Sequence, residues 1–334
     1  MPRTYRISYA LAALPVVLLA CLWASPMAAA ETRLKVGISE PVNTVLALWM
    51  AEAGGVYAAH GLKVEIINMS GGSRGAQELA AGRIDVMHVG LSSVVRLNGT
   101  GADLRVIASL SNVIRFTFFS APGVETATDL KAGVVAVSAF GSESDATVTL
   151  ALQRLRLARD DVILKEYGGG IARLAALKTG EIKATALNEP VASAAREEGL
   201  NAMVDLAADR IPWLFSGLVV KRSALEANRE PLVRFLKATI EGNYLALADA
   251  TRAKEVLAKE TKVTDPKIIA ISYDDFRQQT PVNAEPSRRG AENVLAQFPN
   301  NVSRNIEAYV DTSILDGLRQ DGSLASLEQK YGRR

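Results

Sequence analysis

The chain has 334 residues, with 38 lysines and arginines against 36 aspartates and glutamates. At roughly 150 residues per domain, this length predicts two domains. The first thirty residues contain two arginines and no acid, so the rest of the chain carries 36 basic and 36 acidic groups and is formally neutral. This balance argues against a nucleic-acid-binding protein, which needs a basic surface. The single cysteine excludes a disulfide framework, a cysteine-ligated zinc site and an iron–sulfur cluster.

Residues 1–30 have the pattern of a secretory signal peptide. Two arginines precede an apolar stretch over residues 7–24, and small residues follow it up to Ala30. This order predicts export from the cytoplasm and cleavage after Ala30. A retained membrane anchor is one alternative, although the stretch is short for a span and contains Pro15. A lipobox ending at Cys21 is another, in which Cys21 is lipidated and becomes the mature N-terminus.

Beyond residue 30, apolar alternation predicts strands, and helical patterns separate most of them. This is the βαβ pattern, which favours an α/β fold with parallel sheets covered by helices on both faces. Ser92 and Ser93 are expected to cap the helix that follows the third strand. The chain beyond Ser223 is expected to be helical. The predicted strands are 34–38, 63–67, 84–89, 105–110, 115–120, 134–138, 162–167, 182–187 and 214–220, and the predicted helices include 44–59, 75–81, 145–157, 171–179, 190–198 and 231–248.

The pattern restarts after a break at residues 121–123, which predicts two α/β lobes. Residues 79–86 and 177–184 each follow a glycine-rich loop, and each reads as the end of a helix, a glycine and a strand. Two similar lobes explain this internal similarity. The alternative is that any α/β protein repeats such units.

Two histidines are present, and one of them lies where α/β sheets bind ligands. His60 is expected at a helix end, where a histidine is ordinary. His88 is expected near the carboxyl end of a strand and is a candidate ligand contact. Two isolated histidines without cysteine predict no metal site. The sequence has no Walker A motif and no G-x-G-x-x-G, so no nucleotide cofactor is expected.

The segment from Gly71 to Gly75 matches G-x-S-x-G, the nucleophile elbow of α/β hydrolases. Such an enzyme needs an acid and then a histidine after Ser73, and His88 is the only histidine there. A whole triad within one helix–strand unit is geometrically improbable. We therefore predict that the protein is not an enzyme, with a secreted serine hydrolase using Ser73 as the alternative.

Small residues at helix starts leave backbone N–H groups available to cradle an anion. Tight turns are the alternative explanation for each loop. Polar residues are expected at the presumed cleft. Aromatic residues are expected where the chain crosses between the lobes, namely Phe116, Phe118, Trp213 and Phe215, and packing between the lobes is the alternative role for them. The candidate ligand-binding residues are Ser70, Gly71, Gly72, Ser73, His88, Ser92, Ser93, Arg115, Ser138, Gly141, Ser142, Asn188 and Glu189, with the loop 168–170 as a further cradle.

These segments, in this order, resemble the solute-binding proteins of ABC importers in the nitrate/sulfonate/taurine family, which also includes thiamine-precursor (pyrimidine) binders. The resemblance covers nearly the whole chain after residue 30. Its matching segments are 61–65, 71–73, 79–86, 129–133, 175–182, 188–190 and 311–322.

The resemblance implies a periplasmic binding protein fold of type II, in which two α/β lobes are joined by two crossover strands. It places residues 31–118 and 217–334 in the first lobe and residues 119–216 in the second. It implies a periplasmic, monomeric protein without a cofactor, which closes over a small ligand and presents it to a membrane permease and its ATPase. A sensory or partner-presenting role is the alternative to transport.

The expected ligand is a small organic anion of the sulfonate, taurine or nitrate kind. A pyrimidine (thiamine precursor) or an aromatic carboxylate is the alternative. Ser39 and Asn43 join the candidate ligand-binding residues, because the loop after the first strand often sets ligand choice in the family. Glu40 in that loop suits a fully anionic ligand poorly, and Lys183 replaces an aspartate common in the second lobe's repeat. The cysteine-rich motif of the fungal pyrimidine-synthesising relatives is absent.

Overall fold

The computed structural model describes residues 1, 2, 4 and 31–332. The chain divides into two compact units, Met1–Ala30 and Glu31–Arg334. The apolar stretch, Cys21 and the cleavage site predicted after Ala30 lie outside the described residues. Within the described part of the chain, no helix is both long enough and apolar enough to cross a membrane.

A five-stranded sheet forms the first lobe, with strand order β2-β1-β3-β10-β4. β1 pairs in parallel with β2 and with β3, which sets the buried Leu34 opposite Val64. β10 runs antiparallel to β3 and β4. The strands are β1 Thr32–Ile38, β2 Leu62–Asn68, β3 Val86–Val89, β4 Leu104–Val113 and β10 Pro212–Lys221.

A second five-stranded sheet forms the second lobe, with strand order β7-β6-β8-β5-β9. β6 pairs in parallel with β7 and β8, whereas β5 runs antiparallel to β8 and β9. The strands are β5 Thr117–Ser120, β6 Val134–Val137, β7 Ile163–Glu166, β8 Ala184–Leu187 and β9 Asn201–Asp205. β9 was not predicted from the sequence, and it is an edge strand without a fully buried side chain.

The two lobes are confirmed, but the sheets are mixed rather than parallel as predicted. The chain crosses from β4 in the first sheet to β5 in the second, and it returns from β9 to β10. A helix crossover between two strands of the same sheet makes those strands parallel. β5 and β10 each arrive from the other sheet, without such a crossover, so they are free to run antiparallel to their neighbours. The lobe boundaries at residues 118 and 217 stay a prediction.

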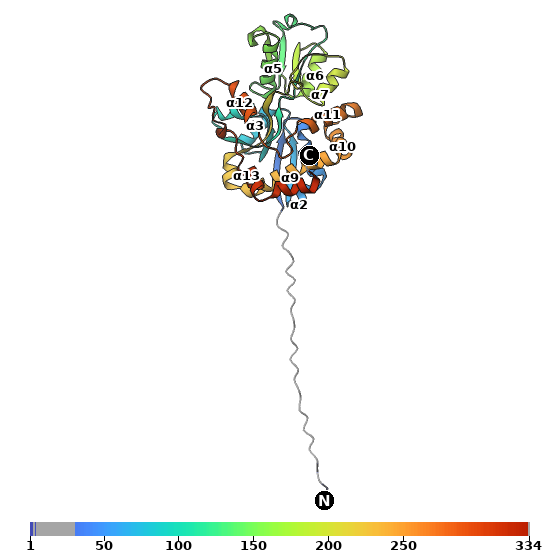
Figure 1. Cartoon of the computed structure of the whole chain (residues 1–334), viewed down its shortest axis with the longest axis vertical. Coiled ribbons are helices and arrows are strands. Elements are labelled where there is room, and N and C mark those ends of the chain that lie inside the picture. The colour runs from blue at the N-terminus through green and yellow to red at the C-terminus, as the bar shows by residue number, and fades with distance from the viewer. Residues whose placement is uncertain (3, 5–30, 333–334) are drawn as a thin grey trace. The chain divides into compact units, whose positions relative to one another are not determined.

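Helices cover both sheets, and Figure 1 shows α5, α6 and α7 at one end of the second unit and α2, α9 and α13 at the other. α9 is the longest, as predicted. The helices are α1 Leu46–Ala53, α2 Val56–Ala59, α3 Gly72–Ala80, α4 Leu91–Asn98, α5 Glu143–Arg154, α6 Gly170–Lys178, α7 Val191–Glu197, α8 Arg222–Ala227, α9 Arg229–Ala248, α10 Ala250–Thr261, α11 Pro266–Gln279, α12 Arg288–Ala296, α13 Ser313–Gln320 and α14 Ser323–Tyr331.

Two local predictions were wrong. The helix predicted over residues 44–59 is interrupted at Gly54 and Gly55, because Gly55 has a φ of 68° and ends the regular helix. Ser92 and Ser93 do not cap α4, since this helix begins at Leu91 with Gly90 as its N-cap. Both serines therefore lie inside the first turn.

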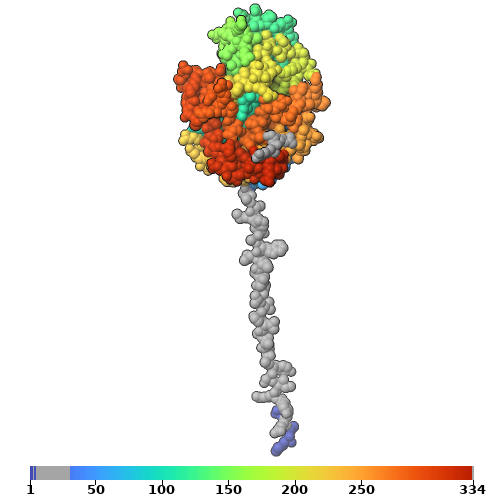
Figure 2. Space-filling model, viewed as in Figure 1, coloured from blue at the N-terminus to red at the C-terminus, as the bar shows by residue number. Residues whose placement is uncertain are grey.

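The C-terminal helices pack mainly on the first lobe. α9 lies along α1 and α2, and the rings of Tyr57 and Phe235 stack with centroids 5.6 Å apart. α11 also reaches α7 of the second lobe, where Lys267 Nζ lies 2.5 Å from Glu197 Oε1. Figure 2 shows these C-terminal segments, in orange to red, over much of one face below the green and yellow second lobe. The C-terminal part thus touches both sides of the cleft.

Candidate functional site

A cavity of about 70 Å³ lies between the two lobes at the carboxyl ends of several parallel strands. This is where open α/β sheets bind ligands. The first lobe contributes residues at or just after the ends of β1, β2 and β3, together with two residues of β10. The second lobe contributes residues just after β6 and β8, together with Arg173 of α6. The lining residues are Ser39, Glu40, Val42, Thr44, Gly72, His88, Val89, Gly90, Ser93, Phe116, Ser138, Ser142, Glu143, Ser144, Arg173, Asn188, Phe215 and Ser216.

The structure brings some of the predicted ligand-binding residues together and leaves others outside the lining. Those in the lining are Ser39, Gly72, His88, Ser93, Ser138, Ser142 and Asn188. Those outside it are Asn43, Ser70, Gly71, Ser73, Ser92, Arg115, Gly141 and Glu189. Ser92, Gly141 and Ser142 line a neighbouring interlobe cavity of about 230 Å³.

His88 is buried at the end of β3 and contacts two hydroxyl groups. Its Nε2 atom lies 3.3 Å from Thr44 Oγ1 and also contacts Ser216 Oγ. Burial lowers the pKa of His88 to about 4, so the ring is neutral at pH 7. Among the described residues, its Nδ1 atom has no hydrogen-bond partner. His88 therefore offers the cavity a neutral ring rather than a positive charge.

Ser73 does not form the serine–histidine pair that a hydrolase requires. Its side chain is buried in α3, and its Oγ atom has no hydrogen-bond partner within residues 31–332. The hydroxyl that contacts His88 most closely belongs to Ser216. The G-x-S-x-G segment here forms the start of α3, and no histidine of the described residues hydrogen-bonds to its serine.

At the N-terminus of α4, the N–H groups are met by a carboxylate of the protein itself. Glu143 reaches from the first turn of α5, and its Oε1 atom accepts from the Ser92 backbone N–H at 2.7 Å. Its Oε2 atom accepts from Trp213 Nε1 at 2.6 Å. Burial raises the pKa of Glu143 to about 7, and the two hydrogen bonds oppose this shift. Glu143 was not among the predicted ligand-binding residues, because the neighbouring Ser138, Gly141 and Ser142 were predicted to supply hydrogen-bond donors to an anion.

The N-terminus of α6 is occupied in the same way from the opposite direction. Glu40 follows β1 in the first lobe, and its Oε2 atom accepts from the Gly170 N–H at 2.6 Å. Its Oε1 atom lies 3.8 Å from Arg173 Nη2. Burial raises the pKa of Glu40, while Arg173 and the Gly170 N–H lower it. Glu40, which suits an anionic ligand poorly, thus binds the 168–170 loop that was predicted to bind the anion.

The loop before α5 directs its polar groups largely at its own residues. The hydroxyls of Ser138, Ser142 and Ser144 lie 2.9–3.0 Å from one another. The Gly141 N–H donates to Asp145 Oδ2 at 2.8 Å, which places another carboxylate at a predicted cradle. The hydroxyls still line the cavity, but their hydrogen bonds are shared among themselves.

The N-terminus of α3 differs, because no carboxylate contact is recorded there in the described part of the chain. The Gly71 N–H donates to the Ser39 carbonyl at 2.8 Å, and the Ser70 N–H donates to Asn68 Oδ1 at 2.9 Å. Gly72 then opens the helix and lines the cavity. A Cβ atom on Gly72 would lie 2.8 Å from Val89 Cγ2 and 3.2 Å from Ser39 Oγ, so the approach is close.

Arg173, the one arginine in the lining, is committed to the protein. Its Nε atom donates to the Gly168 carbonyl at 3.0 Å, and its Nη1 atom donates to Thr185 Oγ1 at 3.0 Å and to the Ala186 carbonyl. Glu40 faces its remaining nitrogen. The cavity therefore holds no unpaired arginine or lysine among the described residues.

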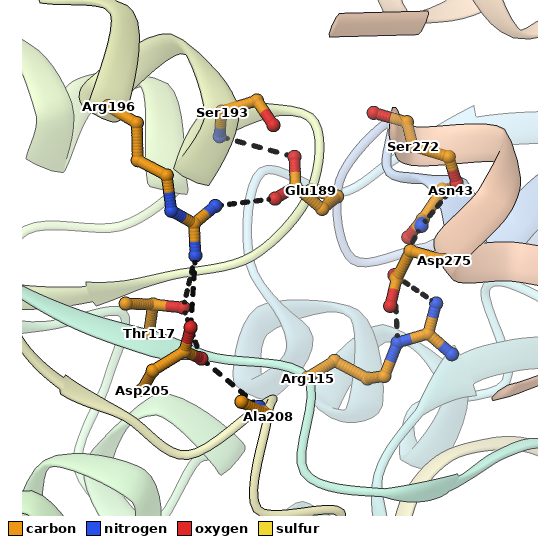
Figure 3. Close-up of polar contacts among 10 residues, drawn as sticks. All are labelled: Asn43, Arg115, Thr117, Glu189, Ser193, Arg196, Asp205, Ala208, Ser272 and Asp275. Carbon is orange, nitrogen blue, oxygen red and sulfur yellow. Dashed lines mark hydrogen bonds and ion pairs between the residues drawn. The ribbon is translucent and has the colours of Figure 1, made fainter. Parts of the chain in front are cut away.

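Two further ion pairs flank the cleft, and together they engage three residues predicted to bind ligand (Figure 3). Arg115 pairs with Asp275 of α11, and Asn43 Nδ2 donates to the same Asp275 carboxylate at 2.7 Å. Glu189 accepts from Arg196 Nη1 at 2.9 Å and from the Ser193 N–H at 3.2 Å. These contacts occupy the charged groups of Arg115 and Glu189 within the protein.

Two aromatic rings join Val42 and Val89 in the apolar part of the lining. Phe116 lies between β4 and β5 and Phe215 lies near the start of β10, and their rings meet edge to face with centroids 5.1 Å apart. Trp213, also near the start of β10, binds Glu143 instead of lining the cavity. In residues 31–332, no group of three or more histidine, cysteine, aspartate or glutamate side chains could hold a metal ion.

Comparisons with known proteins agree with the predicted resemblance. A family model described as NMT1/THI5 like matches residues 43–253. No curated protein sequence matches the chain.

Solved structures share the fold at low sequence identity. A protein from Bordetella bronchiseptica RB50 is 20% identical, with a TM-score of 0.76 over 87% of this chain and 98% of that one. The periplasmic aliphatic sulphonate binding protein SsuA from Escherichia coli is 21% identical, with a TM-score of 0.63 over 87% of this chain and 92% of that one. The desulfurization enzyme DszB is 17% identical, with a TM-score of 0.62 over 88% and 99%. The periplasmic binding protein fold is confirmed, and because the fold also occurs in an enzyme it does not decide the function.

Proposed function

The chain belongs to the NMT1/THI5-like family, and from that premise we propose that it is the extracytoplasmic solute-binding component of an ABC importer. It captures a small solute in the interlobe cavity and delivers it to a membrane permease, which works with its own ATPase. The observation that carries this proposal is that both lobes line one cavity at the carboxyl ends of their strands. A solute in this place touches both lobes at once.

Capture works by closure of the hinge and involves no covalent step. A ligand stabilises the closed form only through contacts that the open form lacks, so contacts from both lobes are required. The two crossings between the sheets act as the hinge, since they are the short connections that change direction when lobes move. The lack of a hydrogen bond between Ser73 and His88 within the described residues supports binding over hydrolysis.

For the ligand, we infer a small organic solute with an anionic group of the sulfonate, taurine or nitrate kind. The N-terminus of α3, with Gly72 in the lining, is the place for that group, because helix N-termini favour anions. A pyrimidine (thiamine precursor) or an aromatic carboxylate is the second candidate, favoured by the Phe116 and Phe215 rings.

The experiment that tests this function is mass spectrometry of small molecules that co-purify with the protein, followed by thermal unfolding with sulfonates, taurine, nitrate, aromatic carboxylates and pyrimidines. A true ligand at 100 times its dissociation constant should stabilise the protein by about 2.7 kcal/mol. Small-angle scattering should then show contraction on binding. A protein that co-purifies with no solute and responds to no member of the panel contradicts the proposed function.

We also propose that the protein is periplasmic and monomeric, exported by its N-terminal segment and cleaved after Ala30. A lipid anchor at Cys21 is the alternative. The intact mass of the exported protein separates the two outcomes, since a mature chain that begins at Glu31 lacks Cys21 altogether. A sensory role differs from transport in its partner, and co-purification with a permease supports transport.

A further inference from the structure

The helix starts around the cleft differ in what meets their N–H groups. Glu143 binds the start of α4, Glu40 binds the start of α6 and Asp145 binds the loop before α5. For α4 and α6, the carboxylate comes from the opposite lobe. At the starts of α4 and α6, the positive end of the helix is therefore already balanced by a carboxylate of the opposite lobe, and neither favours a purely anionic solute.

Glu143 has a built niche at the start of α4. Its two oxygen atoms each accept one N–H, from Ser92 and from the Trp213 indole, and the side chain is buried. Gly90 makes room for it, since a Cβ atom there would collide with the Glu143 carboxylate. With the lobes in this arrangement, the two donors and the space at Gly90 hold the Glu143 carboxylate in the cavity lining.

The Glu143 carboxylate also has unused capacity to accept hydrogen bonds. An ionised carboxylate offers about four acceptor positions; two N–H groups of the protein fill two of them here, and the Ser92 hydroxyl lies beside a third. Glu143 lines the cavity, so its remaining positions are available to a solute. Glu40 adds a second carboxylate to the same lining. Arg173 does not compete for Glu143, because its donors go to carbonyls, Thr185 and Glu40.

We propose that the bound solute carries an amine or an amidine-like N–H donor that faces Glu143, and that Glu143 is a specificity-determining residue of the cavity. The proposal rests on the proposed function and narrows its ligand class. The solute is then a small amino-bearing compound whose anionic group, where it has one, lies at the start of α3. The same anion without the amine leaves the Glu143 carboxylate buried and unpaired on its cavity side, which penalises binding.

Matched pairs of solutes test this inference, because each pair differs only by the amine. Titration calorimetry compares taurine with ethanesulfonate and β-alanine with propionate, on the wild-type protein and on Glu143→Gln. We expect the amino member of a pair to bind at least about tenfold more tightly to the wild type, since a charge-assisted hydrogen bond supports such a ratio. Glu143→Gln should reduce that ratio to near one.

A matched control is Asp129→Asn, which alters an exposed carboxylate that accepts the Thr126 N–H and does not line the cavity. It should keep the full preference for the amine. If Glu143→Gln does not fold, Gly90→Ala provides a second variant, because the added methyl group displaces the Glu143 carboxylate without removing it. Gly90→Ala should also lose the preference.

Each other outcome overturns the inference. Equal affinities within a pair on the wild type reject it. A preference for the amine that persists undiminished in Glu143→Gln also rejects it, because another group then recognises the amine. A co-purified solute without any N–H donor rejects the inference but leaves the proposed function intact, whereas a protein that binds no solute at all rejects both.

Discussion

The starts of α3 and α4 face the same cavity and have similar sequences of small residues, yet they have different surroundings. At α4, Gly90 leaves space that the Glu143 carboxylate fills from the other lobe. At α3, Gly72 approaches Val89 and Ser39, and no carboxylate contact is recorded there among the described residues. The comparison teaches that a glycine at a helix start can admit either a ligand or a side chain of the protein. Only the partner across the cleft distinguishes the two uses.

The largest expected effect comes from removing the arginine that supports the carboxylate-filled start of α6. Arg173→Met leaves Glu40 buried without its ion-pair partner, and it removes the side-chain donor to the Gly168 and Ala186 carbonyls. We expect the free energy of unfolding to fall by about 3–5 kcal/mol. Urea denaturation measures this change. Arg159→Met is the control, because its pair with Asp145 is partly exposed, and it should cost at most about 1 kcal/mol. Equal losses in the two variants would contradict the role given to Arg173.

The second prediction concerns pH, because Glu143 and His88 titrate in opposite senses. The pKa of Glu143 is raised to about 7, so the folded protein binds more protons than the unfolded chain, and its contribution to stability is lost as the pH rises towards 7. The pKa of His88 is lowered to about 4, so its contribution is lost as the pH falls towards 4. In the wild type, these two slopes offset each other over much of the range between pH 4.5 and 6.5.

Glu143→Gln should therefore unmask a rise in stability with pH. Relative to the wild type, it should gain up to about 3 kcal/mol between pH 4.5 and 7, which is the free energy of a shift of this size. Urea denaturation at a series of pH values measures the difference between the two curves. Asp129→Asn controls for the loss of a carboxylate, and a difference curve that is flat across this window would contradict the raised pKa of the buried Glu143.

The third prediction contrasts the two glycines directly. In Gly72→Ala, the added methyl group meets Val89 and Ser39 at the α3 start, and overpacking should cost about 1–2 kcal/mol of stability. The affinity for the anionic group should fall about tenfold, since the helix N–H groups are obstructed. Gly90→Ala should instead change the preference for the amine. Titration calorimetry with taurine and ethanesulfonate separates the two effects. If both variants weaken both solutes equally, α3 and α4 do not have different roles.

The smallest effect is expected at Ser73. Its hydroxyl is buried and has no hydrogen-bond partner in residues 31–332, so Ser73→Ala removes an unsatisfied polar group. Stability should stay within about 1 kcal/mol of the wild type, and any change should be a gain. Thermal unfolding and solute titration check this outcome. Ser216→Ala is the informative comparison, because Ser216 contacts His88. A large loss of binding in Ser73→Ala alone would assign Ser73 a direct ligand contact.

Local patterns predicted much of the fold and part of the cavity. The alternation in residues 34–38 and 63–67 identifies β1 and β2, and the restart after residue 123 indicates the second lobe. His88, Gly72 and Asn188 were placed at strand ends, and they line the cavity. β9 escaped prediction because it is an edge strand with little apolar burial. The antiparallel strands in the two sheets were not predicted, because the sequence of a strand does not indicate which sheet the strand joins.

The sequence by itself determined the order and approximate places of most strands and helices, that the chain forms two lobes, and that small residues gather at helix starts, because each of these depends on residues close together in the chain. The tertiary structure alone decided which helix start receives a carboxylate. Glu143 meets Ser92 across 51 positions, and Glu40 meets Gly170 across 130. Contacts at such separations depend on how the two lobes face each other, and no local pattern of charge or periodicity encodes that geometry.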